Sequence, residues 1–131
     1  MCIFCKIIQG DLPSFKVYED EYVLAFLDIN PVTLGHTLVV PKHHVENIEH
    51  ASEECLMHLA KTLPTIANQI KSTCQAKGFN YLSNSEKVSG QLVDHLHFHI
   101  IPRYSEQDNF KIEQETIHLD LNEVLDTILD K

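Results

Sequence analysis

A strict alternation of histidine and apolar residues runs from His95 to Ile100 and constrains the fold more than any other feature of the chain. Successive side chains of a β-strand point to opposite faces, so the three histidines share one face, and Leu96, Phe98 and Ile100 share the other. The apolar face is expected to pack on a core. The pattern therefore predicts a strand over residues 92–102 whose other face carries imidazoles, where most half-buried strands carry varied polar side chains.

The alternating histidines, His95, His97 and His99, would lie about 6.6–7 Å apart along such a strand. Imidazole is a nucleophile, an acid–base group and a metal ligand near neutral pH. The spacing alone leaves three interpretations open. His95 and His97 bind one metal ion, the three histidines form a nucleophile with supporting acid–base groups, or they are surface residues without a chemical role.

Four other runs of apolar and β-branched residues predict strands. The acidic pair Asp20 and Glu21 separates the first two runs, which favours an antiparallel hairpin. The predicted strands cover residues 16–19, 23–27, 36–40 and 79–83.

Leucine and isoleucine at spacings of three and four then predict one long helix. Ser52 is placed to cap its start, Gly78 to end it and Pro64 to kink it. A short helix or turn is expected at residues 2–9 and an amphipathic helix at residues 119–129. The fold class is therefore α+β, an antiparallel sheet with one long helix and a short C-terminal helix.

The chain has 131 residues, which suits a single domain over residues 1–131, and its formal net charge is −9 at pH 7. This charge disfavours binding to a nucleic-acid backbone, although a local site can still accept a nucleotide. The sequence shows neither an apolar run long enough to span a bilayer nor a signal peptide. We therefore expect no membrane partner and a cytoplasmic location.

The segment from His95 to Ile101 resembles the motif of the histidine triad (HIT) proteins, His-φ-His-φ-His-φ-φ, in which φ is apolar. Similar stretches stand elsewhere at matching positions, namely CIFCKII at residues 2–8, LAFLDINP at 24–31, GHTLVVPK at 35–42 and Gly90-Gln91. The resemblance runs over about residues 2–104. It favours the branch of small nucleoside phosphoramidate and dinucleoside polyphosphate hydrolases, and it implies an HIT-like domain.

The resemblance implies an enzyme that acts on a purine nucleotide derivative as a homodimer. His97 is the implied nucleophile, which attacks the α-phosphorus and forms a nucleotidyl-histidine intermediate before water releases a nucleoside monophosphate. His99 is implied to hold the phosphate oxygens and His36 to orient the triad. A neutral imidazole attacks through its unprotonated nitrogen, so an acceptor, in this family a backbone carbonyl, must hold the other nitrogen.

The resemblance also implies a nucleotide pocket. Asp28 matches the acid that binds the ribose hydroxyls, and Asn84, Gly90 and Gln91 match the phosphate side. From the residues alone, such positions are more often turn formers or core. The residues that match the apolar walls around the base are Ile3, Phe4, Ile7, Phe26 and Ile29.

Cys2 and Cys5 form a Cys-x-x-Cys pair, which suits either a redox dithiol or half of a zinc site. A redox pair normally follows a strand, and no predicted strand precedes Cys2. Zinc needs two more ligands. The resemblance supplies His44 and His95, with His43 as the alternative to His44, and so implies a structural zinc ion.

The chain departs from the family at Leu92, where relatives usually carry Ser or Thr. Either the site lacks a hydroxyl donor, or Leu92 points into the core and a neighbour such as Ser89 donates instead. Arg103 is a candidate phosphate contact, and residues 105–131 do not obviously match the family. Two rival functions stay open, namely a nucleotide-binding sensor or adaptor with incidental hydrolysis and a metallohydrolase that uses His95 and His97.

Overall fold

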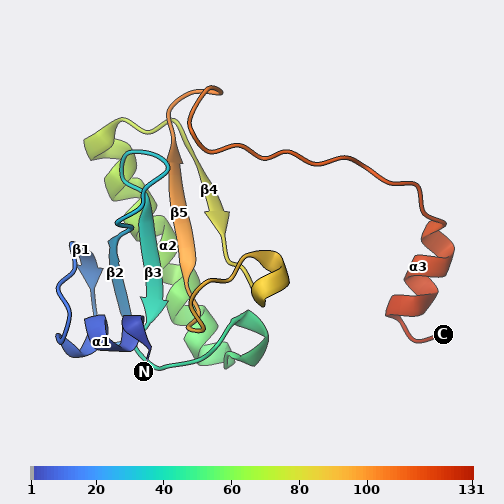
Figure 1. Ribbon diagram of the computed structural model, residues 1–131, viewed down its shortest axis with the longest axis horizontal. Helices are drawn as coiled ribbons and strands as arrows, with labels where there is room; N and C mark the ends of the chain where they lie inside the picture. Colours follow the sequence, from blue (N-terminus) through green and yellow to red (C-terminus); the bar gives the residue numbers. More distant parts are fainter. Residues whose placement is uncertain (1) are drawn as a thin grey trace.

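A five-stranded antiparallel sheet, in the order β1-β2-β3-β5-β4, forms the centre of the computed structural model, which describes residues 2–131 (Figure 1). Every neighbouring pair of strands is antiparallel, as the sequence predicted. The strands are β1 (Lys16–Glu19), β2 (Val23–Leu27), β3 (Thr37–Pro41), β4 (Gly78–Leu82) and β5 (Phe98–Arg103).

Two helices cover the sheet, and a third lies away from it. The long helix α2 (Glu53–Cys74) packs across one face, and α1 (Ile3–Gln9) lies against the other at one end of β2 and β3 (Figure 1). Two short 3-10 turns, η1 (Ile48–His50) and η2 (Lys87–Ser89), interrupt the loops. The α+β class predicted from the sequence is confirmed.

Alternate residues of β2 face two separate apolar clusters. Val23 and Ala25 pack with Leu59 and Ile66 of α2. Leu24 and Phe26 pack instead with Phe4 of α1 and with the β3 residues Leu38 and Val40. A strand that is buried on both faces is expected at the centre of such a layered fold.

The long helix begins as the sequence predicts and ends earlier. Ser52 Oγ accepts a hydrogen bond from the Cys55 amide at 3.1 Å, so Ser52 is the N-cap. The prediction that Gly78 ends the helix is wrong, because Gln75 adopts the left-handed conformation (φ 66°) at the C-cap and Gly78 begins β4. Pro64 lies inside the helix, which continues beyond it to Cys74.

The histidine-rich strand is shorter than predicted, since β5 begins only at Phe98. Its partner β3 ends at Pro41, and the ladder between them covers residues 37–39 of β3. Before β5 other bonds replace the ladder: the Leu96 amide donates to the Val45 carbonyl at 2.7 Å. The alternation nevertheless persists, because Leu96 and Ile100 are buried in the cluster on the α2 side.

The C-terminal part of the chain extends away from the sheet as an arm and ends in α3 (Leu121–Ile128) (Figure 1). The predicted terminal helix is therefore present, with Asp120 as its N-cap. Among residues 2–131, no helix is both long and apolar enough to cross a membrane.

Candidate functional site

A cavity of about 670 Å³ opens on the α1 side of the sheet and gathers most of the predicted site residues. Its lining includes the three residues predicted to be catalytic, His36, His97 and His99. The predicted pocket residues in the lining are Ile3, Phe4, Ile7, Phe26, Asp28, Ile29, Asn84 and Gly90.

Hydrogen bonds fix the proton positions of His36 and His99. The Val32 amide donates to His36 Nδ1 at 3.2 Å, so the His36 proton resides on Nε2, which lies 2.9 Å from His99 Nδ1. His99 therefore accepts at Nδ1 and carries its own proton on Nε2. Burial, followed by the neighbouring His97 and His36, lowers the pKa of His99 to about 4, so this imidazole is neutral at neutral pH.

His97 is held in the opposite tautomer. Its Nδ1 lies 2.7 Å from the His95 carbonyl oxygen and donates to it, which leaves the lone pair on Nε2. Burial lowers the pKa of His97 as well. Ser83 Oγ donates to the His97 carbonyl at 2.8 Å, and the Phe4 ring meets the imidazole edge-on with 5.1 Å between ring centres. The unprotonated nitrogen that nucleophilic attack requires is thus provided by backbone geometry.

Asp28 directly follows β2 and lies beside His36 and His99. Its Oδ1 accepts from the Asn30 amide at 2.8 Å, and its Oδ2 lies 3.5 Å from His36 Nε2. Gly90 closes the other side of the cavity in the left-handed conformation (φ 97°), and a Cβ there would stand 3.3 Å from Asn84 Nδ2. A side chain at position 90 would therefore push Asn84 aside.

Gln91 does not line the cavity, contrary to the prediction that groups it with the pocket residues. Its side chain is buried and ties the loop together instead. The amide nitrogen donates to the carbonyls of Glu46 at 2.7 Å and Val93 at 3.0 Å, and the amide oxygen accepts from the Glu86 amide at 2.8 Å. Gln91 satisfies backbone groups that have no strand partner before β5.

Cys2, Cys5, His44 and His95 converge at the start of α1, with all four donor atoms within 4.8 Å of one another. His95 donates from Nε2 to the Pro41 carbonyl at 2.9 Å, so its Nδ1 lone pair faces the cluster. This Nδ1 lies 3.1 Å from His44 Nδ1, 3.4 Å from Cys2 Sγ and 3.7 Å from Cys5 Sγ.

Those separations of 3.1–3.7 Å are close to the distances of about 3.3–3.8 Å between the sulfur and nitrogen ligands of a tetrahedral zinc ion. The donor set of two thiols and two imidazoles is also a common one for structural zinc. The residues therefore fit the metal that the resemblance implies. The rival interpretation in which His95 and His97 share one ion does not fit, because the free Nδ1 of His95 belongs to the cysteine cluster, which does not include His97.

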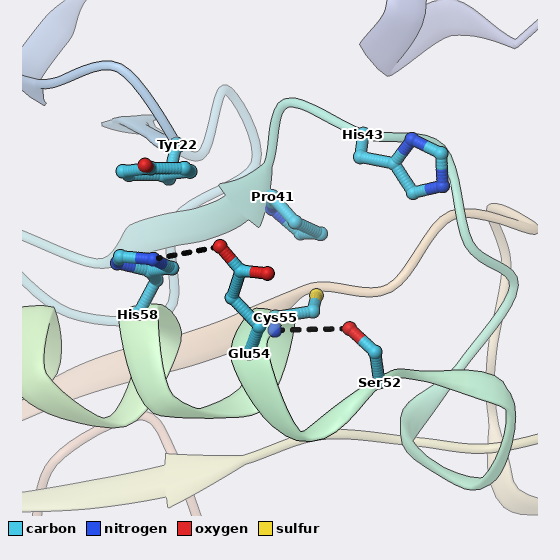
Figure 2. A pocket seen from close by; sticks show the side chains of 7 residues that line it. All are labelled: Tyr22, Pro41, His43, Ser52, Glu54, Cys55 and His58. Carbon is cyan, nitrogen blue, oxygen red and sulfur yellow. Dashed lines mark hydrogen bonds and ion pairs between the residues drawn. The ribbon is translucent and has the colours of Figure 1, made fainter.

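A second, smaller cavity of about 260 Å³ lies beside the start of α2 (Figure 2). His43 lines this cavity, so of the two neighbouring histidines only His44 belongs to the cysteine cluster. Tyr22 stacks on His58 with 3.7 Å between ring centres, and His58 lies 3.8 Å from Glu54. Burial raises the pKa of the Cys55 thiol, which favours its protonated form and argues against a reactive cysteine.

The lining of the 670 Å³ cavity also includes Leu92 and Phe110, and of these two only Phe110 was not foreseen from the sequence. Leu92 lines it and is 93% exposed, so the alternative in which Leu92 points into the core is wrong. Phe110 lines it from beyond β5, a region without a recognisable motif. Arg103, considered as a phosphate contact, instead donates to Asp108 Oδ2 at 3.0 Å and to Asn80 Oδ1 at 2.6 Å.

Comparison with known proteins identifies the family. A family profile described as HIT domain matches residues 9–106. The chain belongs to the HIT domain family. This HIT protein is 53% identical over 109 residues to "Protein hit" of Bacillus subtilis. The match covers 83% of this chain and 75% of the relative.

Solved structures agree along nearly the whole chain. A crystal structure of a HIT family member from Bacillus subtilis matches with a TM-score of 0.92 and 46% identity, covering 99% of this chain and 96% of that one. The likeness therefore includes the C-terminal arm, for which the sequence showed no obvious match. A structure titled as a Zn-bound histidine triad family protein from Mycobacterium smegmatis matches with a TM-score of 0.77 and 38% identity, covering 81% of this chain and 77% of that one.

Two relatives carry names that state an activity. The adenosine 5'-monophosphoramidase of Candida albicans is 38% identical over 109 residues, covering 80% of this chain and 72% of the relative. The adenylylsulfatase of Arabidopsis thaliana is 40% identical over 102 residues, covering 78% of this chain and 52% of the relative. At the level of the family, these names support nucleotide hydrolysis.

Proposed function

We propose that this HIT protein hydrolyses nucleoside phosphoramidates or dinucleoside polyphosphates at the α-phosphorus, with His97 as the nucleophile. The observation that carries the proposal is the tautomer of His97. Its Nδ1–H donates a hydrogen bond to the His95 carbonyl, so Nε2 keeps a lone pair. The cavity that His97 lines also contains the neutral His99. The two relatives named as a phosphoramidase and an adenylylsulfatase support the same reaction class.

The reaction runs in two displacements. His97 Nε2 forms a bond to the α-phosphorus as the bond from phosphorus to the leaving group breaks, and an amine leaving group takes up a proton from solvent. His99 donates a hydrogen bond from its Nε2–H to a phosphoryl oxygen and so stabilises the charge that develops there. Water then attacks the phosphorus and releases a proton to solvent, the bond to His97 breaks, and nucleoside monophosphate and neutral imidazole result.

The rest of the cavity binds the nucleotide. Asp28 is placed to accept hydrogen bonds from ribose hydroxyls, and Asn84 with the Gly90 backbone faces the phosphates. A purine base lies against the apolar walls between α1 and β2. These walls are Ile3, Phe4, Ile7, Phe26 and Ile29.

Cys2, Cys5, His44 and His95 are proposed to hold one structural zinc ion, which the donor distances favour. Zinc supplies a cross-link there and takes no part in the displacement. The nucleophile His97 lies two residues after the metal ligand His95. The cross-link therefore fixes His97 relative to α1, which carries walls of the base pocket. A cytoplasmic location belongs to the same proposal and suits the four free cysteines.

The test compares adenosine phosphoramidate with diadenosine tetraphosphate as substrates of the wild-type protein and of His97→Ala. We expect wild type to release AMP, and we expect His97→Ala to lose at least about 10³-fold in kcat while still binding AMP. Residual turnover within about tenfold of wild type would refute the nucleophile. A sensor or adaptor would bind AMP with no turnover in wild type, and a metallohydrolase would stop at once on adding a chelator.

A further inference from the structure

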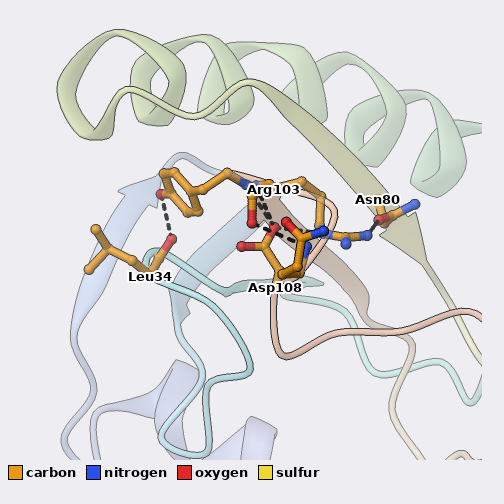
Figure 3. A network of polar contacts seen from close by, with 7 residues as sticks. Leu34, Asn80, Arg103 and Asp108 are labelled. Carbon is orange, nitrogen blue, oxygen red and sulfur yellow. Dashed lines mark hydrogen bonds and ion pairs between the residues drawn. The ribbon is translucent and has the colours of Figure 1, made fainter.

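The turn that follows β5 is organised around one carboxylate. Asp108 Oδ2 accepts from the Tyr104 amide at 2.7 Å, from Arg103 Nε at 3.0 Å and from the Ser105 amide at 3.2 Å (Figure 3). These hydrogen bonds, the Tyr104 amide first, lower the pKa of Asp108. Asp108 is therefore charged at neutral pH and holds residues 103–108 in a single compact turn, named here the Asp108 turn.

The Asp108 turn is tied to two other parts of the fold. Arg103 reaches across to Asn80 Oδ1 on β4 at 2.6 Å, and the Tyr104 hydroxyl donates to the Leu34 carbonyl at 2.7 Å (Figure 3). Leu34 belongs to the loop that joins Asp28 to His36. A turn anchored on β4 and on this loop has little freedom to move relative to the cavity.

The Asp108 turn delivers Phe110 to the cavity. The guanidinium carbon of Arg103 lies 5.6 Å from the centre of the Phe110 ring, a cation–π distance. Phe110 is half-buried and lines the same cavity as His97 and His99, whereas every residue from 111 to 120 is exposed. Phe110 is thus the last described residue of the chain in the cavity.

Strand register shows which end of the cavity Phe110 occupies. His99, Ile101 and Arg103 alternate along β5, so they share one face of the sheet. Asn80 is paired with Ile101 in the outermost strand, β4. The base walls on α1 and β2 lie on the other side of β3. Phe110 therefore stands at the β5–β4 end, beyond the histidines and opposite the base walls.

A substrate with its base at the α1–β2 end and its phosphorus at His97 directs its leaving group away from His97, since the displacement is in line. We infer that Phe110 is a specificity-determining residue that contacts the leaving group, and that Asp108 is a positioning residue that holds Phe110 in place. The inference rests on the proposed hydrolase function. The leaving groups favoured are those with an aromatic ring, such as an aryl-alkyl amine or a second nucleobase.

The test compares two adenosine phosphoramidates that differ only in the leaving group, ammonia or tryptamine, with the full-length protein. Stacking on an aromatic side chain is worth about tenfold or more. Phe110→Ala should therefore lower kcat/KM about tenfold for the tryptamine substrate and less than twofold for the ammonia substrate. Asp108→Asn should shift the same ratio in the same direction, a selectivity change that a purely structural role would not produce.

Phe15→Ala is the matched control, because Phe15 lines the same cavity, is 68% exposed and directly precedes β1, at the sheet edge opposite β4. It should affect both substrates equally. The inference is overturned if Phe110→Ala keeps the wild-type melting temperature and either loses kcat/KM equally on both substrates or loses none. If wild type turns over neither substrate, the proposed function fails. Binding affinities measured by calorimetry in the His97→Ala background then decide the inference. Phe110→Ala should weaken the binding of diadenosine tetraphosphate and leave the binding of AMP unchanged.

Discussion

At the scale of single residues, the site depends on where three protons reside. His36 Nε2 donates a hydrogen bond to His99, whose own Nε2–H is free to donate in the cavity. His97 Nδ1 instead donates to a backbone carbonyl. Identical side chains therefore present a donor and an unprotonated nitrogen to the cavity only because their hydrogen-bond partners differ. The sequence predicts which histidines these are, but tautomers depend on contacts with Val32 and the His95 carbonyl that only the folded chain creates.

The depressed pKa of His99 predicts a flat titration over the range in which free histidine protonates. The pKa is lowered from 6.5 to about 4, so between these values the folded protein binds fewer protons at His99 than the unfolded chain does. The contribution of His99 to stability is complete above pH 6.5 and is lost as pH falls toward 4. We expect the His99 ring signals in NMR to stay unchanged from pH 8 to pH 5. Movement centred near pH 6.5 would contradict the prediction.

Leu92 predicts a substrate preference. Its exposed side chain lines the cavity, where it donates no hydrogen bond to a departing amine. An amine leaves only with a proton, whereas a polyphosphate leaves as a stable anion. We expect Leu92→Ser to raise kcat/KM for adenosine phosphoramidate by about tenfold, below the 10²–10³ that a well-placed donor contributes, and to change diadenosine tetraphosphate less.

Val88→Ser controls for a general effect of added polarity, because Val88 is 96% exposed on η2 and outside the cavity lining. An unchanged ratio of the two substrates in Leu92→Ser would exclude Leu92 from leaving-group chemistry.

At the scale of elements, hydrophobic periodicity predicted which helices and strands form, but it did not predict where they end. The long helix and the hairpin of β1 and β2 follow from apolar spacing, because α2 needs an apolar stripe and β2 is buried on both faces. The ends of elements were harder to predict. Gln75 in the left-handed conformation ends α2 before Gly78. β5 begins only at Phe98, because the Leu96 amide bonds to the Val45 carbonyl outside the ladder. Local bonds, which carry no period, determine such boundaries.

The cysteine cluster ties α1 to the segment that leads into β5, and it predicts a metal-dependent stability. Removing both thiols leaves zinc with two ligands at most from this set. We expect Cys2→Ser with Cys5→Ser to lose the single zinc ion per chain and to melt at a lower temperature, because metal binding adds to the folding free energy. Cys74→Ser, outside the cluster, should keep the metal. Elemental analysis decides, and zinc retained by the double variant would refute this ligand set.

At the scale of the whole molecule, residues 111–131 form an arm that lies apart from the body of its own chain (Figure 1). Seven large apolar side chains of the arm are at least half exposed, namely Ile112, Ile117, Leu119, Leu121, Leu125, Ile128 and Leu129. An isolated helix as short as α3 is marginal in water, so its formation needs an apolar surface to pack on. The arm follows the fold of the Bacillus subtilis HIT protein, whose structure covers 99% of this chain.

We propose that the surface is supplied by a second copy of the chain, in a homodimer that the arms of both subunits stabilise. Leu121, Leu125 and Ile128 recur at spacings of four and three and so share one face of α3. Leu125→Asp with Ile128→Asp should therefore shift the mass measured by light scattering from twice the chain mass toward that of one chain. Glu123→Gln, on the same helix but outside this apolar face, should remain dimeric. A double variant that keeps the dimer at micromolar concentration would show that the arm has no part in assembly, because two buried unpaired carboxylates in an interface are not tolerated.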